Sequence, residues 1–271
     1  MKASRAFLAF LISLAACRQD MHDQPKLELL EKHSFFADSR SVRPQVPGTV
    51  ARGQLYQDRH LYAGLSERKQ PELALFPVSE EELERALERI AGPPLAETFP
   101  FPITREHLAH GRERFEIFCS PCHGLFGAGD GIVVHRGFRR PPSYHIDRLR
   151  RAPVGHFFDV MTRGIGAMGD FADRIPPGDR WAITAYIRAL QLSQEAPLTE
   201  IPTVLPPPTP QPEVPSIPRL QTDPIADYER LRSAQQARLD SYGWADQEQK
   251  ILHLPIERAI DLLLEKGLPV R

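Results

Sequence analysis

Apolar and small residues recur at helical intervals in three stretches near the middle of the chain. The first stretch begins after Thr104, whose hydroxyl can cap a helix. Its apolar face carries Leu108, Gly111, Phe115 and Phe118. The second stretch covers residues 154–162, and the third begins near Pro177, a residue that suits a first helical turn. Loops with glycine and proline separate the three, so the pattern predicts a mainly α-helical domain over residues 104–195.

The segment before this domain has little periodicity. Residues 17–103 are polar with scattered prolines, which predicts an extended and mostly irregular segment. One short helix is expected within it, over residues 79–90, because Ser-Glu-Glu-Glu at residues 79–82 has the form of a capping box.

Two further segments follow the domain. Prolines are concentrated within residues 202–218, so residues 196–222 are predicted to form an extended linker. The tail, residues 223–271, is expected to hold helices over 223–242 and 255–266, with a short apolar segment at 251–254. A tail of this size is too small for a stable core of its own, so we expect it to dock.

The first 16 residues have the pattern of an export signal. Lys2 and Arg5 precede an uncharged apolar run over residues 6–16, which is too short to cross a bilayer as a helix. The run ends in Leu-Ala-Ala-Cys, which resembles a bacterial lipobox. We therefore expect an acyl anchor on Cys17 and a position on the extracytoplasmic face of the cell membrane. A plain secretory signal with an incidental cysteine is the alternative.

The positions of the cysteines give the most specific indication of a cofactor. The chain has three cysteines, and the two beyond Cys17 lie in the run Cys119-Ser-Pro-Cys122-His123. C-x-x-C-H is the attachment signature of haem c, because the two thiols can reach the two vinyl groups of one porphyrin while the imidazole lies under the iron. A zinc half-site would need two more ligands, and a redox pair belongs in a βαβ unit. One covalent haem c with His123 as proximal ligand is predicted.

The second axial ligand is expected to be Met168. It lies in a glycine-rich loop, residues 164–169, from which a thioether can reach the iron, and Met/His ligation raises the reduction potential. Met161 is the competing methionine, but its helical stretch favours a core position. His135, His145 and His156 are the possible second histidines.

Arginines are frequent between residues 136 and 151. Arg140 is expected to pair with a haem propionate. The carbonyl of Pro141 or Pro142 is expected to accept the Nδ1 proton of His123. The net charge of −1 offers no argument for nucleic acid as a partner.

The order of these features resembles the class I cytochrome c fold. In that fold the first and last helices cross near a small residue and aromatics, and Gly111, Phe115 and Tyr186 match this pattern. Trp181 lies on the same final helix.

Three longer strings narrow the resemblance. They are Cys-Arg-Gln-Asp-Met at 17–21, Gly-Thr-Val-Ala-Arg-Gly at 48–53, and Asp-Arg-Trp-Ala-Ile through Ala-Leu-Gln at 179–191. With the haem motif, residues 14–195 resemble the monohaem cytochrome c lipoprotein subunit of bacterial alternative complex III. Two departures exist: many members have proline where this chain has Gly169, and the tail beyond Pro202 is outside the family core.

This resemblance implies an electron-carrier subunit, not itself an enzyme, of a membrane complex that oxidises quinol. The implied partners are a multihaem cytochrome, an iron–sulfur subunit, integral membrane subunits, and a downstream cytochrome c or haem–copper terminal oxidase. Two rival functions are a haem peroxidase or sensor with an open sixth position, against which Met168 argues, and a free-standing membrane-anchored cytochrome c shuttle.

Overall fold

The computed structural model describes residues 24–28, 31–41, 43, 46, 48–50, 55–66, 79, 94–196, 222–246 and 251–270. The export signal, Cys17, the helix expected over 79–90 (apart from Ser79) and the proline-rich stretch 202–218 lie outside the described residues. The chain divides into two compact units, Met1–Leu55 and Tyr56–Arg271. In the first, Lys32 and Arg40 form an antiparallel bridge, and Arg43 pairs with Asp38 at 2.7 Å.

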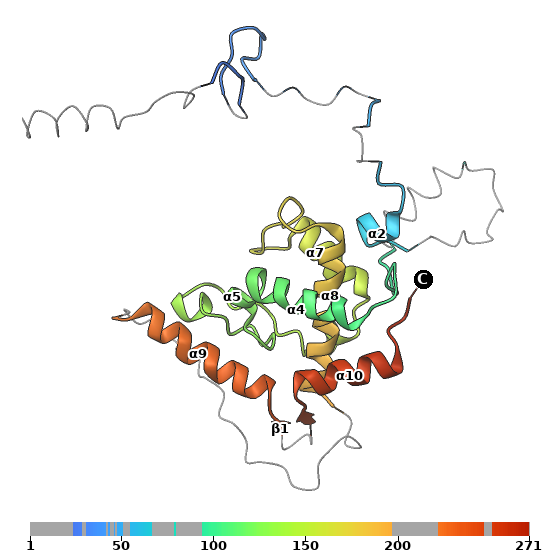
Figure 1. Ribbon diagram of the computed structural model, residues 1–271, viewed down its shortest axis with the longest axis vertical. Coiled ribbons are helices and arrows are strands. Elements are labelled where there is room, and N and C mark those ends of the chain that lie inside the picture. The colour runs from blue at the N-terminus through green and yellow to red at the C-terminus, as the bar shows by residue number, and fades with distance from the viewer. Residues whose placement is uncertain are drawn as a thin grey trace, which may run out of the picture. The chain divides into compact units, whose positions relative to one another are not determined.

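The described part of the second unit is mainly helical (Figure 1). Its elements are α2 (Arg59–Ala63), α4 (Arg105–Phe118), α5 (Ser120–His123), a 3-10 turn η1 (Val134–Arg136), α6 (Asp147–Arg150), α7 (Val154–Arg163), α8 (Pro177–Gln194), α9 (Pro224–Leu239), β1 (Gly243–Asp246), β2 (Ile251–His253) and α10 (Ile256–Lys266). The three helices expected in the central domain are therefore confirmed as α4, α7 and α8.

Helices α4 and α8 cross at Gly111, and this crossing forms the centre of the core. A Cβ atom at Gly111 would overlap the carbonyl oxygen of Ala182, so only glycine allows this approach. Close by, the rings of Phe115 and Tyr186 meet edge to face at 5.4 Å, and both side chains are fully buried. Thr104 caps α4 by accepting a hydrogen bond from the backbone N–H of His107. The expected cap and crossing residues are confirmed.

Helix α7 packs beside α8 through its aromatic face. Phe158 stacks on Trp181 with 4.7 Å between ring centroids, and Phe157 is also buried. Met161 is also buried in this cluster, which confirms its expected core position.

Helix α2 lies where the sequence pattern predicts extended chain. Asp58 caps it, and the indole N–H of Trp181 donates to the carbonyl of Leu61 at 2.9 Å. His60 donates from Nε2 to the carbonyl of Thr98 at 2.6 Å. A five-residue helix is too short to show a helical period, and tertiary contacts with α8 stabilise it.

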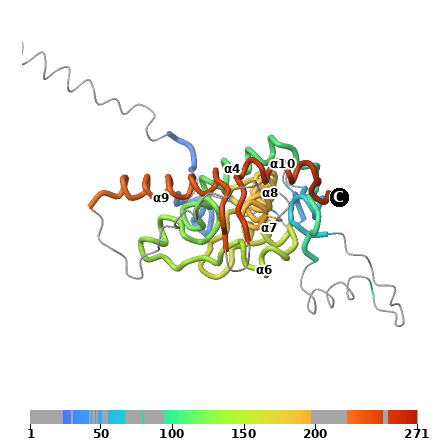
Figure 2. Tube along the Cα trace, turned by 90° about the horizontal axis from the view of Figure 1, so that it is seen from below, coloured from blue at the N-terminus to red at the C-terminus, as the bar shows by residue number. Residues whose placement is uncertain are grey.

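The C-terminal tail docks on the helices of the central domain, as expected. Strands β1 and β2 form a small antiparallel hairpin, with Gly243 opposite His253. The residue directly after β2 is joined to the end of α8, because Leu254 donates its N–H to the carbonyl of Ser193 at 2.7 Å. Helix α10 inserts Ile256 and Ile260 into the main core. Helices α9 and α10 follow one another along the same side of the domain (Figures 1 and 2).

Among the residues that the structure describes, no helix has both the length and the apolar character needed to cross a membrane.

Candidate functional site

The C-x-x-C-H run forms a single helical turn directly after α4. Cys119 ends α4, and its carbonyl accepts the N–H groups of Cys122 at 3.2 Å and of His123 at 2.9 Å. Pro121 suits this turn because it lies at the helix start, where a missing N–H costs nothing. The structure therefore places both thiols and the imidazole on one turn of the chain, residues 119–123, which we call the attachment turn after its predicted role.

The two thiols of this turn differ in exposure. Cys119 is buried and Cys122 is exposed, and both are free. Burial, with a smaller effect from Cys122, raises the pKa of the Cys119 thiol to about 12, so that this sulfur stays protonated at neutral pH.

The imidazole of His123 is buried against Tyr144. The two rings stack with 4.7 Å between centroids and an interplanar angle of 10°. Burial lowers the pKa of His123 to about 4, so the ring is neutral at pH 7 and keeps a nitrogen lone pair. Its Nδ1 atom is buried without a hydrogen-bond partner among the described residues. A neutral imidazole with unused nitrogen capacity is the form that ligates a metal.

The loop after His123 folds back on the C-x-x-C-H turn. The N–H of Gly129 donates to the carbonyl of His123 at 2.8 Å, and the N–H of Gly131 donates to the carbonyl of Cys122 at 3.1 Å. Gly131 packs so closely on the carbonyl of Pro121 that a Cβ atom there would overlap it. The loop thus fixes the backbone of the residues expected to hold the haem.

Met168 lies in a tight turn of the glycine-rich loop. The backbones of Ile165 and Met168 exchange two hydrogen bonds, at 2.9 and 3.0 Å, and Gly166 between them has a φ of 59°. The side chain of Met168 is half-buried and packs against the main core. Backbone hydrogen bonds and core packing therefore support the thioether in this loop.

The three histidines considered as alternative second ligands each have contacts of their own. His145 donates from Nε2 to the carbonyl of Phe126 at 2.6 Å, and burial lowers its pKa to about 4. His156 packs edge to face on Phe157 at 5.6 Å. His135 lies in η1 with a buried Nε2 atom.

Arg140 and Pro141 lie along the loop that follows His123. The guanidinium of Arg140 donates to the carbonyl of Ala128 at 3.1 Å. The carbonyl of Pro141 faces Gly129, where a Cβ atom would overlap it. Neither Pro141 nor Pro142 accepts a hydrogen bond from Nδ1 of His123 in this structure. The propionate contact of Arg140 and the acceptor role of the two prolines stay predictions.

This donor set fits haem c. Two free thiols share one helical turn, a buried neutral imidazole follows them, and a thioether is held in an ordered loop. These are the groups that bind haem c through two sulfurs and ligate its iron through a histidine and a methionine.

Two residues near the site carry no signal in the sequence. One is Tyr144, which stacks on His123, and the other is Gln235 of α9, which bonds the loop after His123. Gln235 lies 110 positions from its partner Leu125, so no local pattern could connect them.

Comparisons with known proteins found a matching family model and similar solved structures. Residues 106–187 match the family model described as cytochrome C oxidase, cbb3-type, subunit III. The chain is also similar to a solved structure of the reducing HAO-like protein complex Kustc0457/Kustc0458 of Kuenenia stuttgartiensis, with 19% identity over 49% of this chain and 69% of that one, and a TM-score of 0.31. Cytochrome CL from the marine methylotrophic bacterium Methylophaga aminisulfidivorans MPT is 20% identical over 44% of this chain and 71% of its own, with a TM-score of 0.27.

A comparison with curated proteins found no match. The family match covers the helix before the attachment turn, the turn itself, the methionine loop and most of α8. Residues 106–187 therefore form a cytochrome c domain with the class I fold, which is a haem c-binding domain for electron transfer.

Proposed function

We propose that this chain carries a single haem c and transfers one electron at a time. Cys119 and Cys122 would hold the group through two thioethers, and His123 and Met168 would be its axial ligands. The observation that carries the proposal is the buried, neutral His123 at the end of a turn with two free thiols. When bound, haem c supplies a one-electron iron couple.

The residues of this chain contribute attachment, orientation and exclusion of water. Each thiol would add its S–H bond across one vinyl group, which needs no external oxidant. Tyr144 orients the His123 ring by stacking, and the folded-back loop holds the backbone of His123 through Gly129. The Met168 turn is closed by two backbone hydrogen bonds and would limit rearrangement between the two redox states. No group in this arrangement needs to bind or transform a substrate.

The test is the intact mass of the mature protein together with its visible spectrum. We expect one added haem that survives denaturation, and a low-spin spectrum with the weak long-wavelength sulfur-to-iron band. Substitution of both cysteines by alanine should abolish covalent attachment. A mass without the added tetrapyrrole would contradict the proposal, and a high-spin spectrum would favour the peroxidase or sensor alternative.

We also infer, from the sequence strings at 17–21, 48–53 and 179–191, that the carrier is the monohaem subunit of a quinol-oxidising membrane complex of the alternative complex III type. Acylation of Cys17 would keep it on the extracytoplasmic face of the membrane. Gentle detergent extraction followed by mass spectrometry should then find a multihaem cytochrome, an iron–sulfur subunit and integral membrane subunits with this chain. If the extracted chain migrates without any of these subunits, a free-standing membrane-anchored shuttle would be favoured.

A further inference from the structure

Helix α9 of the C-terminal tail covers the segment that contains the attachment turn. A cavity lies between α9 and this segment. The segment lines it with Ser120, Pro121, Leu125 and Ile132, and α9 lines it with Tyr228, Leu231, Arg232 and Gln235. The tail is outside the family core recognised in the sequence, and residues 106–187 of the family match do not include it. A role for α9 must therefore be sought in its own contacts.

Gln235 makes the most specific of these contacts. Its side chain is buried, with 3% exposed. The Oε1 atom accepts a hydrogen bond from the backbone N–H of Leu125 at 3.0 Å, and the Nε2 atom donates to the carbonyl of Asp130 at 3.2 Å. One amide thus ties together both ends of the loop that begins directly after His123.

That loop is the same one that holds the attachment turn. Between the two peptide groups bonded by Gln235 lies Gly129, which donates to the carbonyl of His123. Directly after them lies Gly131, which donates to the carbonyl of Cys122. A displacement of the loop would therefore reach the backbone of the predicted ligand through two hydrogen bonds.

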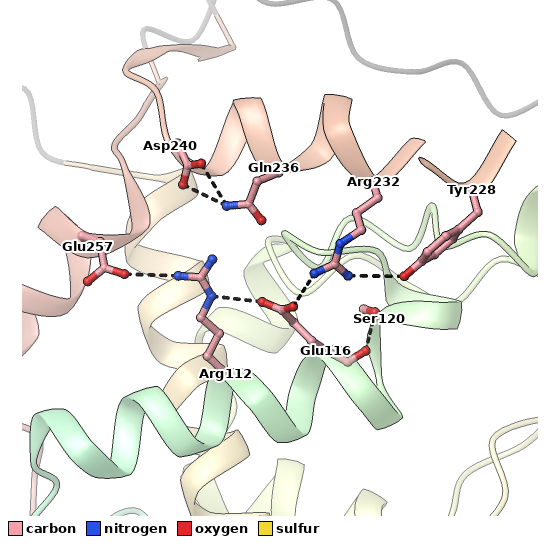
Figure 3. Close-up of polar contacts among 8 residues, drawn as sticks. All are labelled: Arg112, Glu116, Ser120, Tyr228, Arg232, Gln236, Asp240 and Glu257. Carbon is pink, nitrogen blue, oxygen red and sulfur yellow. Dashed lines mark hydrogen bonds and ion pairs between the residues drawn. The ribbon is translucent and has the colours of Figure 1, made fainter. Parts of the chain in front are cut away.

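Side chains along α9 fix the helix against the rest of the domain (Figure 3). Glu116 of α4 accepts from Arg232 of α9 at 2.9 Å and from Arg112 of α4 at 3.0 Å. Arg112 also reaches Glu257 of α10 at 3.1 Å. Farther along α9, the buried Arg238 donates to Gln194 of α8 at 2.9 Å. Helix α9 is therefore held to the domain on both sides of Gln235, through Arg232 and through Arg238.

We propose that Gln235 is a positioning residue for the haem site, and that α9 is a permanent clamp on the proximal side of that site. The redox part of this inference rests on the proposed function. The buried amide of Gln235 takes the place of water on the N–H of Leu125 and the carbonyl of Asp130, in the loop behind His123. Since the oxidised iron carries one more positive charge than the reduced iron, exclusion of water favours the reduced form and raises the midpoint potential.

The test compares Gln235→Met with Gln236→Met in the full-length holoprotein. Methionine has nearly the shape of glutamine but makes neither backbone hydrogen bond. Gln236 is the matched control because it is the next residue on α9 and its side chain, among the described residues, bonds Asp240 alone, one turn away (Figure 3). Amide hydrogen exchange at Leu125 and the midpoint potential are measured for each protein.

We expect Gln235→Met to speed exchange at Leu125 by about tenfold or more and to lower the midpoint potential, while Gln236→Met changes neither. Unchanged exchange at Leu125 would overturn the clamp. Faster exchange with an unchanged potential would overturn the positioning role. If the chain holds no haem, the proposed function fails, but the exchange comparison at Leu125 still tests the clamp. Failure of the proposed function and failure of the clamp are therefore distinguishable.

A second variant covers the case in which Gln235→Met does not fold. Arg232→Gln removes the ion pair to Glu116 at a side chain that is 42% exposed, and loosens α9 without a change in the buried amide. The expected changes have the same direction and are smaller. A potential and an exchange rate equal to those of the wild type would contradict the proposal.

Discussion

Gly111 and Ala182 approach so closely that the α-carbon of the first faces the carbonyl oxygen of the second without room for a methyl group. This approach lets α4 and α8 cross at the level where Phe115 meets Tyr186. The attachment turn begins directly after α4, so the position of the turn relative to the core depends on this crossing.

A Gly111→Ala substitution should force the two helices apart. Overpacking of a well-packed contact of this kind costs about 1–3 kcal/mol, and backbone on both sides leaves little room to yield. The free energy of unfolding in urea measures the loss.

Gly178 provides the matched control for this substitution. It lies in the first turn of α8 with nothing within 4 Å of a Cβ atom, and its φ is not in the left-handed region. Gly178→Ala should leave the free energy of unfolding unchanged or raise it by about 0.4–1 kcal/mol. Equal losses for both variants would contradict the role given to the helix crossing.

Met168→Ala should remove the proposed second axial ligand while the fold persists. The turn that carries Met168 is closed by backbone hydrogen bonds to Ile165, which do not need the thioether. We expect loss of the sulfur-to-iron band, a shift toward a high-spin spectrum and a lower midpoint potential. Visible spectroscopy and a redox titration measure these changes.

Met161→Leu is the matched control for the methionine experiment. Met161 is buried in the core on α7, and leucine has a similar volume. The variant should cost less than about 1.5 kcal/mol and keep the wild-type spectrum. If Met161→Leu altered the spectrum and Met168→Ala did not, the ligand assignment would be reversed.

Glu116→Gln should weaken the attachment of the C-terminal tail. Its carboxylate is shared by Arg112 and Arg232, and all three lie where solvent reaches them only in part. Neutralisation leaves two guanidinium groups without their common anion, at a cost of about 1–2 kcal/mol. Limited proteolysis should then cut the tail faster.

Glu113 lies on the same helix and pairs with Arg114 at 3.3 Å, but its side chain is 60% exposed. Glu113→Gln should therefore change stability by less than about 0.5 kcal/mol and leave the rate of proteolysis unchanged. Faster cleavage of the tail in both variants would show that the loss of charge, and not the shared contact, is responsible.

Acid should loosen the hairpin of the tail through His253. This side chain is buried, with 1% exposed. Burial, helped by the nearby Arg238 charge, lowers the pKa of His253 from 6.5 to about 4. Its contribution to stability is therefore fully present above pH 6.5 and is lost as the pH falls toward 4.

A His253→Leu variant should show a shallower loss of unfolding free energy between pH 6.5 and pH 4. The difference in slope should approach roughly 1 kcal/mol per pH unit, because the unfolded chain binds the proton and the folded chain does not. Urea unfolding at several pH values measures both slopes. Parallel curves for the two proteins would contradict a role of His253 in the acid response.

Local sequence patterns were sufficient to predict much of the structure of the cytochrome c domain. The C-x-x-C-H run, the Thr104 cap and the spacing of Gly111 and Phe115 act over a few residues, so their meaning can be read without the fold. The same holds for the amphipathic faces of α7 and α8, because a helical period repeats along each segment.

Only the tertiary structure decided which distant groups surround the attachment turn. Three contacts join segments that are far apart along the chain, at separations that follow no rule. They are the contacts of Tyr144 with His123, of α2 with Trp181, and of Gln235 with Leu125. Such contacts arise from the joint packing of several elements, and no periodicity or short motif records them. The sequence by itself thus determined the C-x-x-C-H motif, on which the predicted haem attachment rests, and the helices around it, whereas the packing of the described elements decided which distant residues hold that motif in position.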